Sequence, residues 1–271
     1  MRVWGEKTIR ALGLLSAVAL SHCASSVPLT TEFQARSSDR TKVQKASEIF
    51  QLKNKKFNPI HYQIFDSNGI FASNKIVARY RDKGNNVDFT LKLRFDYNES
   101  MLKVLSQCFI DQKVEINRYS DQPNPVIELA FQRSYKKEDM GMEKTKALSE
   151  AQILEQFENL QNNIKMQTAL LAEQNPEFFD HFEDFTDGAK KNFEIVSKKI
   201  NLVSNSNVST WKKTSTFQRD RWSIGAWKTY PEVVIEVTHS DQPSMEISTR
   251  LEGDIADKSF FGDLRLSGLQ I

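Results

Sequence analysis

Residues 87–96 read VDFTLKLRFD, and this stretch decides the expected fold. Apolar and polar side chains alternate along it without a break. Such a period of two is typical of a β-strand with one face on a core and the other in water. The apolar positions are Val87, Phe89, Leu91, Leu93 and Phe95.

Further strand-like segments lie on both sides of this stretch. Turn signals separate them, such as KGNN at 83–86 and DQPNP at 121–125. Connections this short predict antiparallel neighbours. The expected strands are residues 70–80, 101–110, 113–119 and 126–131 before the middle of the chain, and 233–237, 245–249 and 260–266 after it.

The apolar period changes to that of a helix between residues 138 and 202. Asn175, Pro176 and Glu177 are typical of the start of a second helix, so two long helices are expected to fold back as a hairpin. The predicted fold class is therefore α+β, with one or more antiparallel β-sheets and a long central antiparallel α-helical hairpin inserted between two strand-rich segments.

The tetrapeptide SDQP occurs at 120–123 and again at 240–243. This leaves two architectures open: two related sheets that arose by duplication, or one continuous sheet, which we prefer. The expected divisions are a strand-rich part at 48–137, the hairpin at 138–202 and a second strand-rich part at 203–271, all in one domain.

The N-terminus is typical of an export signal. Arg2, Lys7 and Arg10 precede an uncharged run at 11–20 that is about half the length of a membrane-spanning helix. Leu20-Ser21-His22-Cys23 resembles the lipobox of bacterial lipoproteins, with His22 as its one departure. The resemblance implies a signal peptide at 1–22, lipidation of Cys23 and a membrane anchor. An ordinary cut after Ser21 is the alternative.

Residues 23–47 are rich in Ser, Thr, Arg and Gln and are expected to form a flexible tether. The expected location is the cell envelope, as a membrane-anchored lipoprotein; a soluble periplasmic or secreted protein is the alternative. A lipidated Cys23 leaves Cys108 without an intrachain partner, so Cys108 is expected to be a buried thiol.

Several common catalytic sites are excluded by spacing. The ten glycines allow neither a G-x-G-x-x-G fingerprint, nor a P-loop, nor a G-x-S-x-G elbow. The four histidines are far apart, and the sequence has neither H-E-x-x-H nor C-x-x-C. We therefore expect no catalytic residue, metal or cofactor, and no enzyme. With 37 Lys and Arg against 35 Asp and Glu, nucleic acid is not an expected partner.

An aromatic cluster near residue 220 is the candidate binding site. Its rings alternate with lysines and arginines, as in platforms that stack on sugars or lie at lipid headgroups. The alternative is that the rings cover the core. The cluster consists of Trp211, Phe217, Trp222, Trp227 and Tyr230.

The function expected from these features is non-catalytic binding of an apolar or lipid-like ligand, or of an envelope partner. The ligand would lie between the sheet and the hairpin, in a cavity lined by Phe157, Phe178, Phe182 or Phe185. A structural or assembly protein that uses the hairpin as its binding face is one alternative. A hydrolase with a spatially assembled site is another.

Lipidation of Cys23 can be tested directly. We expect mass spectrometry of the protein from the membrane fraction to show a chain that begins at acylated Cys23. An unmodified N-terminus or a retained leader would contradict the prediction.

Overall fold

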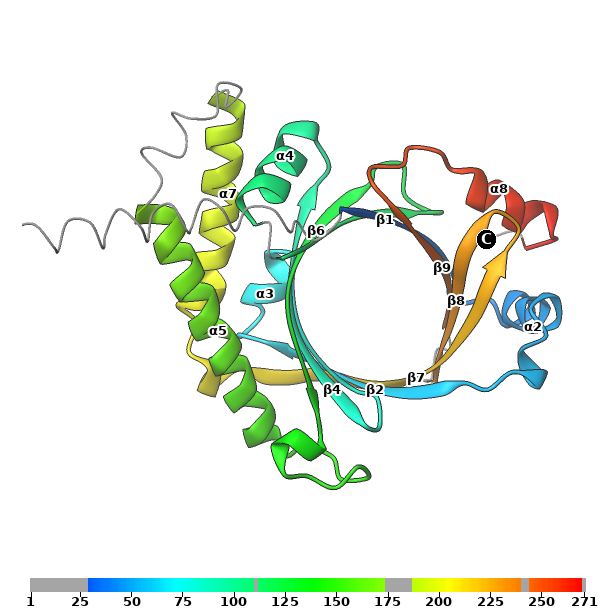
Figure 1. Ribbon diagram of the computed structural model, residues 1–271, viewed down its shortest axis with the longest axis horizontal. Helices are drawn as coiled ribbons and strands as arrows, with labels where there is room; N and C mark the ends of the chain where they lie inside the picture. Colours follow the sequence, from blue (N-terminus) through cyan, green and yellow to red (C-terminus); the bar gives the residue numbers. More distant parts are fainter. Residues whose placement is uncertain (1–28, 110–111, 174–186, 240–243, 270–271) are drawn as a thin grey trace, which may run out of the picture.

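The computed structural model describes residues 29–109, 112–173, 187–239 and 244–269. Within these residues, nine strands form one closed β-barrel in the order β1-β5-β6-β4-β3-β2-β7-β8-β9, with β9 returning to β1 (Figure 1). The strands are β1 (Thr30–Ser37), β2 (Asn58–Asp66), β3 (Ile76–Asp82), β4 (Asn86–Asp96), β5 (Lys113–Tyr119), β6 (Val126–Lys136), β7 (Lys212–Trp227), β8 (Tyr230–His239) and β9 (Ser244–Glu252).

Neighbouring strands of the described barrel are antiparallel except for β1 and β5, which are parallel. Tight turns explain several of the antiparallel pairs. Between β3 and β4, Gly84 has a φ of +83°, which glycine adopts without strain. The Asp82 carboxylate accepts a hydrogen bond from the Gly84 amide at 2.9 Å and fixes this turn.

The helices of the described chain lie outside the barrel (Figure 1). Helices α4, α5 and α7 lie on one side, and α2 and α8 lie on the opposite side. None of the helices in the described ranges is long and apolar enough to cross a membrane. The bounds are α2 (Arg40–Ile49), α3 (Ile70–Ser73), α4 (Glu99–Cys108), α5 (Glu150–Glu173), α7 (Asp187–Ser204) and α8 (Ser259–Leu266), with 3₁₀ turns at Leu52–Asn54, Glu138–Met140 and Val208–Thr210.

The barrel is apolar outside and charged inside. Strand β4 shows this, because its apolar side chains are buried under the helices while Lys92 and Arg94 line the barrel lumen. The alternation predicted for this strand is therefore confirmed, but its polar face lies in an enclosed space instead of on the outer surface.

The first outer core lies between the β2–β6 side of the barrel and helices α4, α5 and α7. Phe157 of α5 is fully buried at its centre. Its ring centroid lies 5.6 Å from those of Phe65 and Phe89 and 5.5 Å from that of Trp211. These rings fix α5 against β2 and β4, at distances where aromatic pairs add to the hydrophobic gain.

Polar side chains fix the ends of these helices. Asn98 caps α4, since its side chain accepts a hydrogen bond from the Met101 amide at 2.7 Å. Gln161 of α5 donates to the carbonyl oxygens of Val203 at 2.6 Å and Ser206 at 2.7 Å. Gln161 thereby joins α5 to the end of α7 and to the turn that follows it.

The second outer core lies under α2 and α8, against β1, β8 and β9. The ring of Phe33 in β1 lies 5.8 Å from that of Phe261 in α8. Trp227, at the end of β7, lies 5.4 Å from Phe50 and 6.3 Å from Phe260. Both helices of this small layer are thus anchored by aromatic side chains.

The predicted fold class, α+β with a central helical hairpin between strand-rich segments, is wrong. Helices α5 and α7 are present, but the strands before and after them form one closed barrel whose outside they cover. The error came from assigning the polar strand faces to water, which favours an open sheet. The predicted link at 175–177 and the residues Phe178, Phe182 and Phe185, which were assigned to the second helix, lie outside the described residues.

Several segments also differ locally from the prediction. Much of the expected tether at 23–47 forms β1 and the start of α2. The expected strand at 101–110 is mostly helix α4, because Asn98 caps it and its buried residues recur at helical spacing. The expected strand at 260–266 is helix α8. The strand predicted at 113–119 is confirmed as β5.

We expect Phe157→Ala to lower the free energy of unfolding by about 3–5 kcal/mol, since it leaves a cavity among three aromatic rings. Urea denaturation would measure this. Met166→Ala on the same helix is the control, because Met166 is 61% exposed and its loss should change stability by less than about 0.5 kcal/mol. Equal effects of the two variants would contradict the packing described.

Candidate functional site

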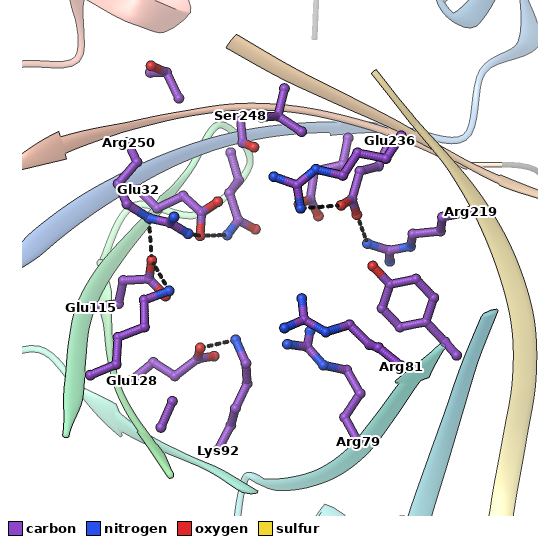
Figure 2. Close-up of a pocket in the computed structure, with 18 of the residues that line it drawn as sticks. Glu32, Arg79, Arg81, Lys92, Glu115, Glu128, Arg219, Glu236, Ser248 and Arg250 are labelled. Carbon is purple, nitrogen blue, oxygen red and sulfur yellow. Dashed lines mark hydrogen bonds and ion pairs between the residues drawn. The ribbon is translucent and has the colours of Figure 1, made fainter. Parts of the chain in front are cut away.

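The barrel lumen holds a charged cavity of about 440 Å³ (Figure 2). Ten basic side chains and six carboxylates line it among the described residues, so cations are in excess. The basic residues are Arg36, Arg79, Arg81, Lys83, Lys92, Arg94, Lys113, Arg219, Arg221 and Arg250, and the acidic ones are Glu32, Glu115, Glu128, Glu232, Glu236 and Glu246.

Strand geometry explains how so many charges meet. Side chains at alternate positions of a strand share one face. Arg79 and Arg81 of β3 therefore point into the lumen together, and Figure 2 shows both aimed at its centre. Arg219, Glu236 and Arg250 reach the same space from β7, β8 and β9. Because the sheet is closed, each strand contributes its alternate residues to one enclosed site.

Most of the carboxylates are paired with cations. Glu128 accepts from Lys92 and from Arg94. Glu115 pairs with the Arg250 guanidinium at 2.6 Å. These pairs make an otherwise costly burial of charge tolerable.

Two further pairs follow the same pattern. Glu236 accepts from Arg219 at 2.8 Å, and Arg36 donates to Glu246 at 2.9 Å. The Arg36 guanidinium also lies 4.5 Å from the centre of the Tyr119 ring. The paired cations therefore occupy fixed positions around the cavity wall.

Glu128 is held ionised by its partners. Burial alone would raise the pKa of its carboxyl group, but Lys92 and Arg94 outweigh burial and lower that pKa to about 2. Burial also lowers the pKa of the Lys92 ammonium. The pair is therefore a fixed structural feature of the lumen across the ordinary pH range.

Arg79 differs from the other cations, because its guanidinium makes no ion pair within the described part of the chain. Its Nε has no hydrogen-bond partner either. Burial, with the nearby charge of Arg81, lowers its pKa to about 10. The Tyr62 ring, whose centroid lies 5.9 Å from Arg79 Cζ, compensates this charge in part. The charges of Glu128 and Glu236 act in the same direction. An anion in the lumen would supply the missing partner.

Glu32 is the carboxylate best suited to exchange a proton. Burial and the neighbouring Glu115 raise the pKa of Glu32, while Arg250, at 3.5 Å, opposes this shift. A titratable group with a perturbed pKa inside a cavity is typical of a general acid or base.

A second cavity of about 670 Å³ adjoins the lumen and shares Arg94 with it. We call it the vestibule; apolar residues contribute much of its lining, among them Ile64, Val77, Pro123 and Pro125. Val77 lies two positions from Arg79 on β3, so the same strand face changes from charged to apolar along the barrel.

The predicted aromatic site is divided by the structure. Trp211 lies in the first outer core, while Trp222, Trp227 and Tyr230 belong to the second. The Tyr230 hydroxyl donates to the Asp263 carboxylate at 2.9 Å. Only Phe217 lies beside the lumen, with its ring stacked 5.0 Å from that of Tyr62.

Other predicted residues also have definite places. Phe157 is packed among rings and lines neither the lumen nor the vestibule. Cys108 is a buried free thiol, as expected. Cys23 lies outside the described residues. No cluster of three or more His, Cys, Asp or Glu side chains suited to a metal ion is found in the part of the chain that the structure describes.

Sequence reasoning missed the lumen residues. Their signal was present in the polar halves of the alternating strands, such as Lys92 and Arg94 within 87–96. Alternation alone does not distinguish a strand face in bulk water from one inside a closed barrel.

No protein-family model matches the sequence, and no curated protein matches it. Two solved structures are similar in fold. One is a candidate adenylate cyclase from Bacillus halodurans, with 15% identity and a TM-score of 0.42 over 90% of this chain and 91% of that one. The other is a candidate adenylyl cyclase from Hippeastrum with a dominant triphosphatase activity; it has 14% identity and a TM-score of 0.43 over 88% and 87% of the two chains.

The predicted function, non-catalytic binding of an apolar or lipid-like ligand, is contradicted. The main cavity is lined mostly by charged side chains, which do not suit such a ligand. The prediction that the protein is not an enzyme is corrected as well. That prediction rested on the absence of catalytic motifs within short stretches of sequence. The cavity in the structure is instead assembled from residues of nine separate strands.

We expect Glu128→Gln to lower the free energy of unfolding by about 3–5 kcal/mol at pH 7, because Lys92 keeps a buried charge without its partner. Glu128 has a lowered pKa, so its contribution is complete above its unfolded pKa and is lost as the pH falls toward about 2. The difference in the free energy of unfolding between wild type and variant should therefore become smaller below about pH 4.

Chemical denaturation at pH 7 and at pH 3 would measure this gap. The triple variant Lys92→Met, Arg94→Met and Glu128→Met is the control, and it should regain most of the lost stability, since no charge of this cluster is left unpaired. A single variant as stable as wild type at pH 7 would show that the pair does not hold the lumen together.

Proposed function

We propose that the protein is a hydrolase that binds the phosphate chain of its substrate in the lumen and cleaves a phosphoanhydride bond. The observation that carries this proposal is the unpaired Arg79 guanidinium inside a cavity with more cations than carboxylates. A phosphate chain offers several negative oxygens in a row, and arginine forks bind such oxygens in pairs.

The position of the other cations supports the same substrate. Arg81 and Arg219 reach the lumen beside Arg79, and Arg94 lies where the lumen meets the vestibule. A chain of phosphoryl groups could contact all of them, whereas a single phosphate would leave most of these cations without a ligand. A triphosphate is therefore the first substrate class to assay.

The chemical step that we propose uses Glu32 as the general base. Its carboxylate takes a proton from a water molecule as the water oxygen attacks the terminal phosphorus. The bond from that phosphorus to the bridging oxygen breaks, and the leaving phosphate takes the electron pair. Cations fixed around the lumen stabilise the charge that develops on the phosphoryl oxygens.

The lining of the vestibule suits an organic group at the far end of the phosphate chain. Ile64, Val77 and Pro125 present apolar surface there, and the volume of about 670 Å³ falls within the range of small-molecule sites. We therefore propose an organic triphosphate, such as a nucleotide, in preference to inorganic triphosphate.

We expect Arg79→Met to weaken binding of ATP and of inorganic triphosphate by about 10- to 100-fold, the loss expected for hydrogen bonds to a charged group. The same variant should be at least as stable as wild type, since it removes an unpaired charge from the lumen. Isothermal titration and thermal denaturation would measure the two effects.

Lys190→Met on α7 is the matched control, because Lys190 is exposed and makes no ion pair within the described residues. It should change neither measurement. Wild-type protein that binds no triphosphate at low salt would overturn the proposal. Binding without phosphate release, with and without Mg²⁺, would overturn its catalytic part, and equal affinity for ATP and triphosphate would overturn the role of the vestibule.

A further inference from the structure

A basic surface on the second helical layer is not explained by the lumen. Six cations lie between residues 40 and 56, and only Glu48 is acidic in that segment. None of the six makes an ion pair within the described ranges, and all but the half-buried Lys42 are exposed. The surface consists of Arg40, Lys42, Lys45, Lys53, Lys55 and Lys56.

Packing brings these cations together on one side of the barrel. Helix α2, the turn at Leu52–Asn54 and helix α8 share one apolar cluster beneath the surface. Helices α2 and α8 lie beside each other on the side opposite α5 and α7 (Figure 1). A Cβ placed on Gly268, just after α8, would lie 2.8 Å from the Lys45 ammonium. The basic segment and the end of α8 are therefore one continuous surface.

Two exposed apolar side chains border the cations. Phe57 directly follows Lys56 and is 47% exposed, with its ring 5.4 Å from that of Trp222. Leu266 follows Arg265 at the end of α8 and is 85% exposed. Large apolar side chains at such exposure are costly in water. Exposed apolar side chains beside unpaired lysines are typical of surfaces that bind lipid bilayers. There the cations contact headgroup phosphates, and the apolar side chains enter the boundary of the acyl chains.

We propose that this surface, made of the six cations with Phe57 and Leu266, docks the protein onto an anionic lipid bilayer. Helices on the outside of a barrel form a convex face, and neither the lumen nor the vestibule is lined by these residues. A convex face with dispersed lysines suits a flat field of headgroups better than it suits a single acidic peptide. This docking does not depend on the hydrolase activity proposed above.

Sedimentation with vesicles tests the proposal on the full chain. Vesicles of phosphatidylglycerol and phosphatidylcholine should bind the protein more strongly than vesicles of phosphatidylcholine alone, and about 0.5 M salt should abolish the difference. The triple variant Lys53→Gln, Lys55→Gln and Lys56→Gln should lower partitioning by about 100-fold, at about tenfold or less per lysine.

The matched control is Lys190→Gln, Lys191→Gln and Lys198→Gln on α7, which removes the same charge from exposed positions on the opposite side. Partitioning of this control onto anionic vesicles should fall by less than about threefold, because salt screens the attraction between distant charges and the bilayer. Phe57→Ser should weaken binding without changing its salt dependence. Met166→Ser, at the 61% exposed position on α5, should not weaken it.

Three results would overturn the proposal. One is an equal loss in both triple variants, which would indicate net charge alone. Another is equal binding to anionic and neutral vesicles. The third is salt-sensitive binding to polyglutamate without any preference for anionic vesicles, which would assign the surface to an acidic protein partner.

Discussion

The pairing of carboxylates with cations inside the barrel is the constraint on which the rest of the fold depends. Charges taken out of water are tolerated only when they are paired and hydrogen-bonded, as Glu128 is with Lys92 and Arg94. With the lumen occupied by charge, the apolar strand faces have to point outward. The outer helices then become necessary, because those faces would otherwise meet solvent. Lumen chemistry and helical cover are thus two consequences of one arrangement.

Arg79 is the exception to this pairing, because its guanidinium makes no ion pair within the described residues. A fully neutralised lumen would be more stable and would attract no anion. One buried guanidinium without an ion-pair partner makes the empty barrel less stable, and an anion placed beside it would offset this cost. Functional sites often carry such a local cost, and here the paired charges around Arg79 supply the stability that allows it.

The sequence predicted individual elements better than their assembly. Strand β5 and the alternation of β4 were readable because each depends on local periodicity. Closure of the barrel could not be predicted from the sequence, since it depends on which distant strands pair. Strand β1 was missed because Glu32, Gln34 and Arg36 face the lumen and give residues 30–37 the composition of a tether. The absence of glycine-rich loop motifs could not predict or exclude a charged cavity made of strand side chains.

The contact between the first and last strands has a consequence for how the protein folds. Strand β1 pairs with β9, and the Thr31 hydroxyl bonds to the Gly253 carbonyl across 222 positions of the chain. Contacts this distant are slow to form, because a long loop has to close first. During synthesis, Glu32 therefore meets Arg250 only after β9 has emerged. Until then the charged strand faces remain hydrated, and the protein acquires its enclosed site as one of the last events of folding.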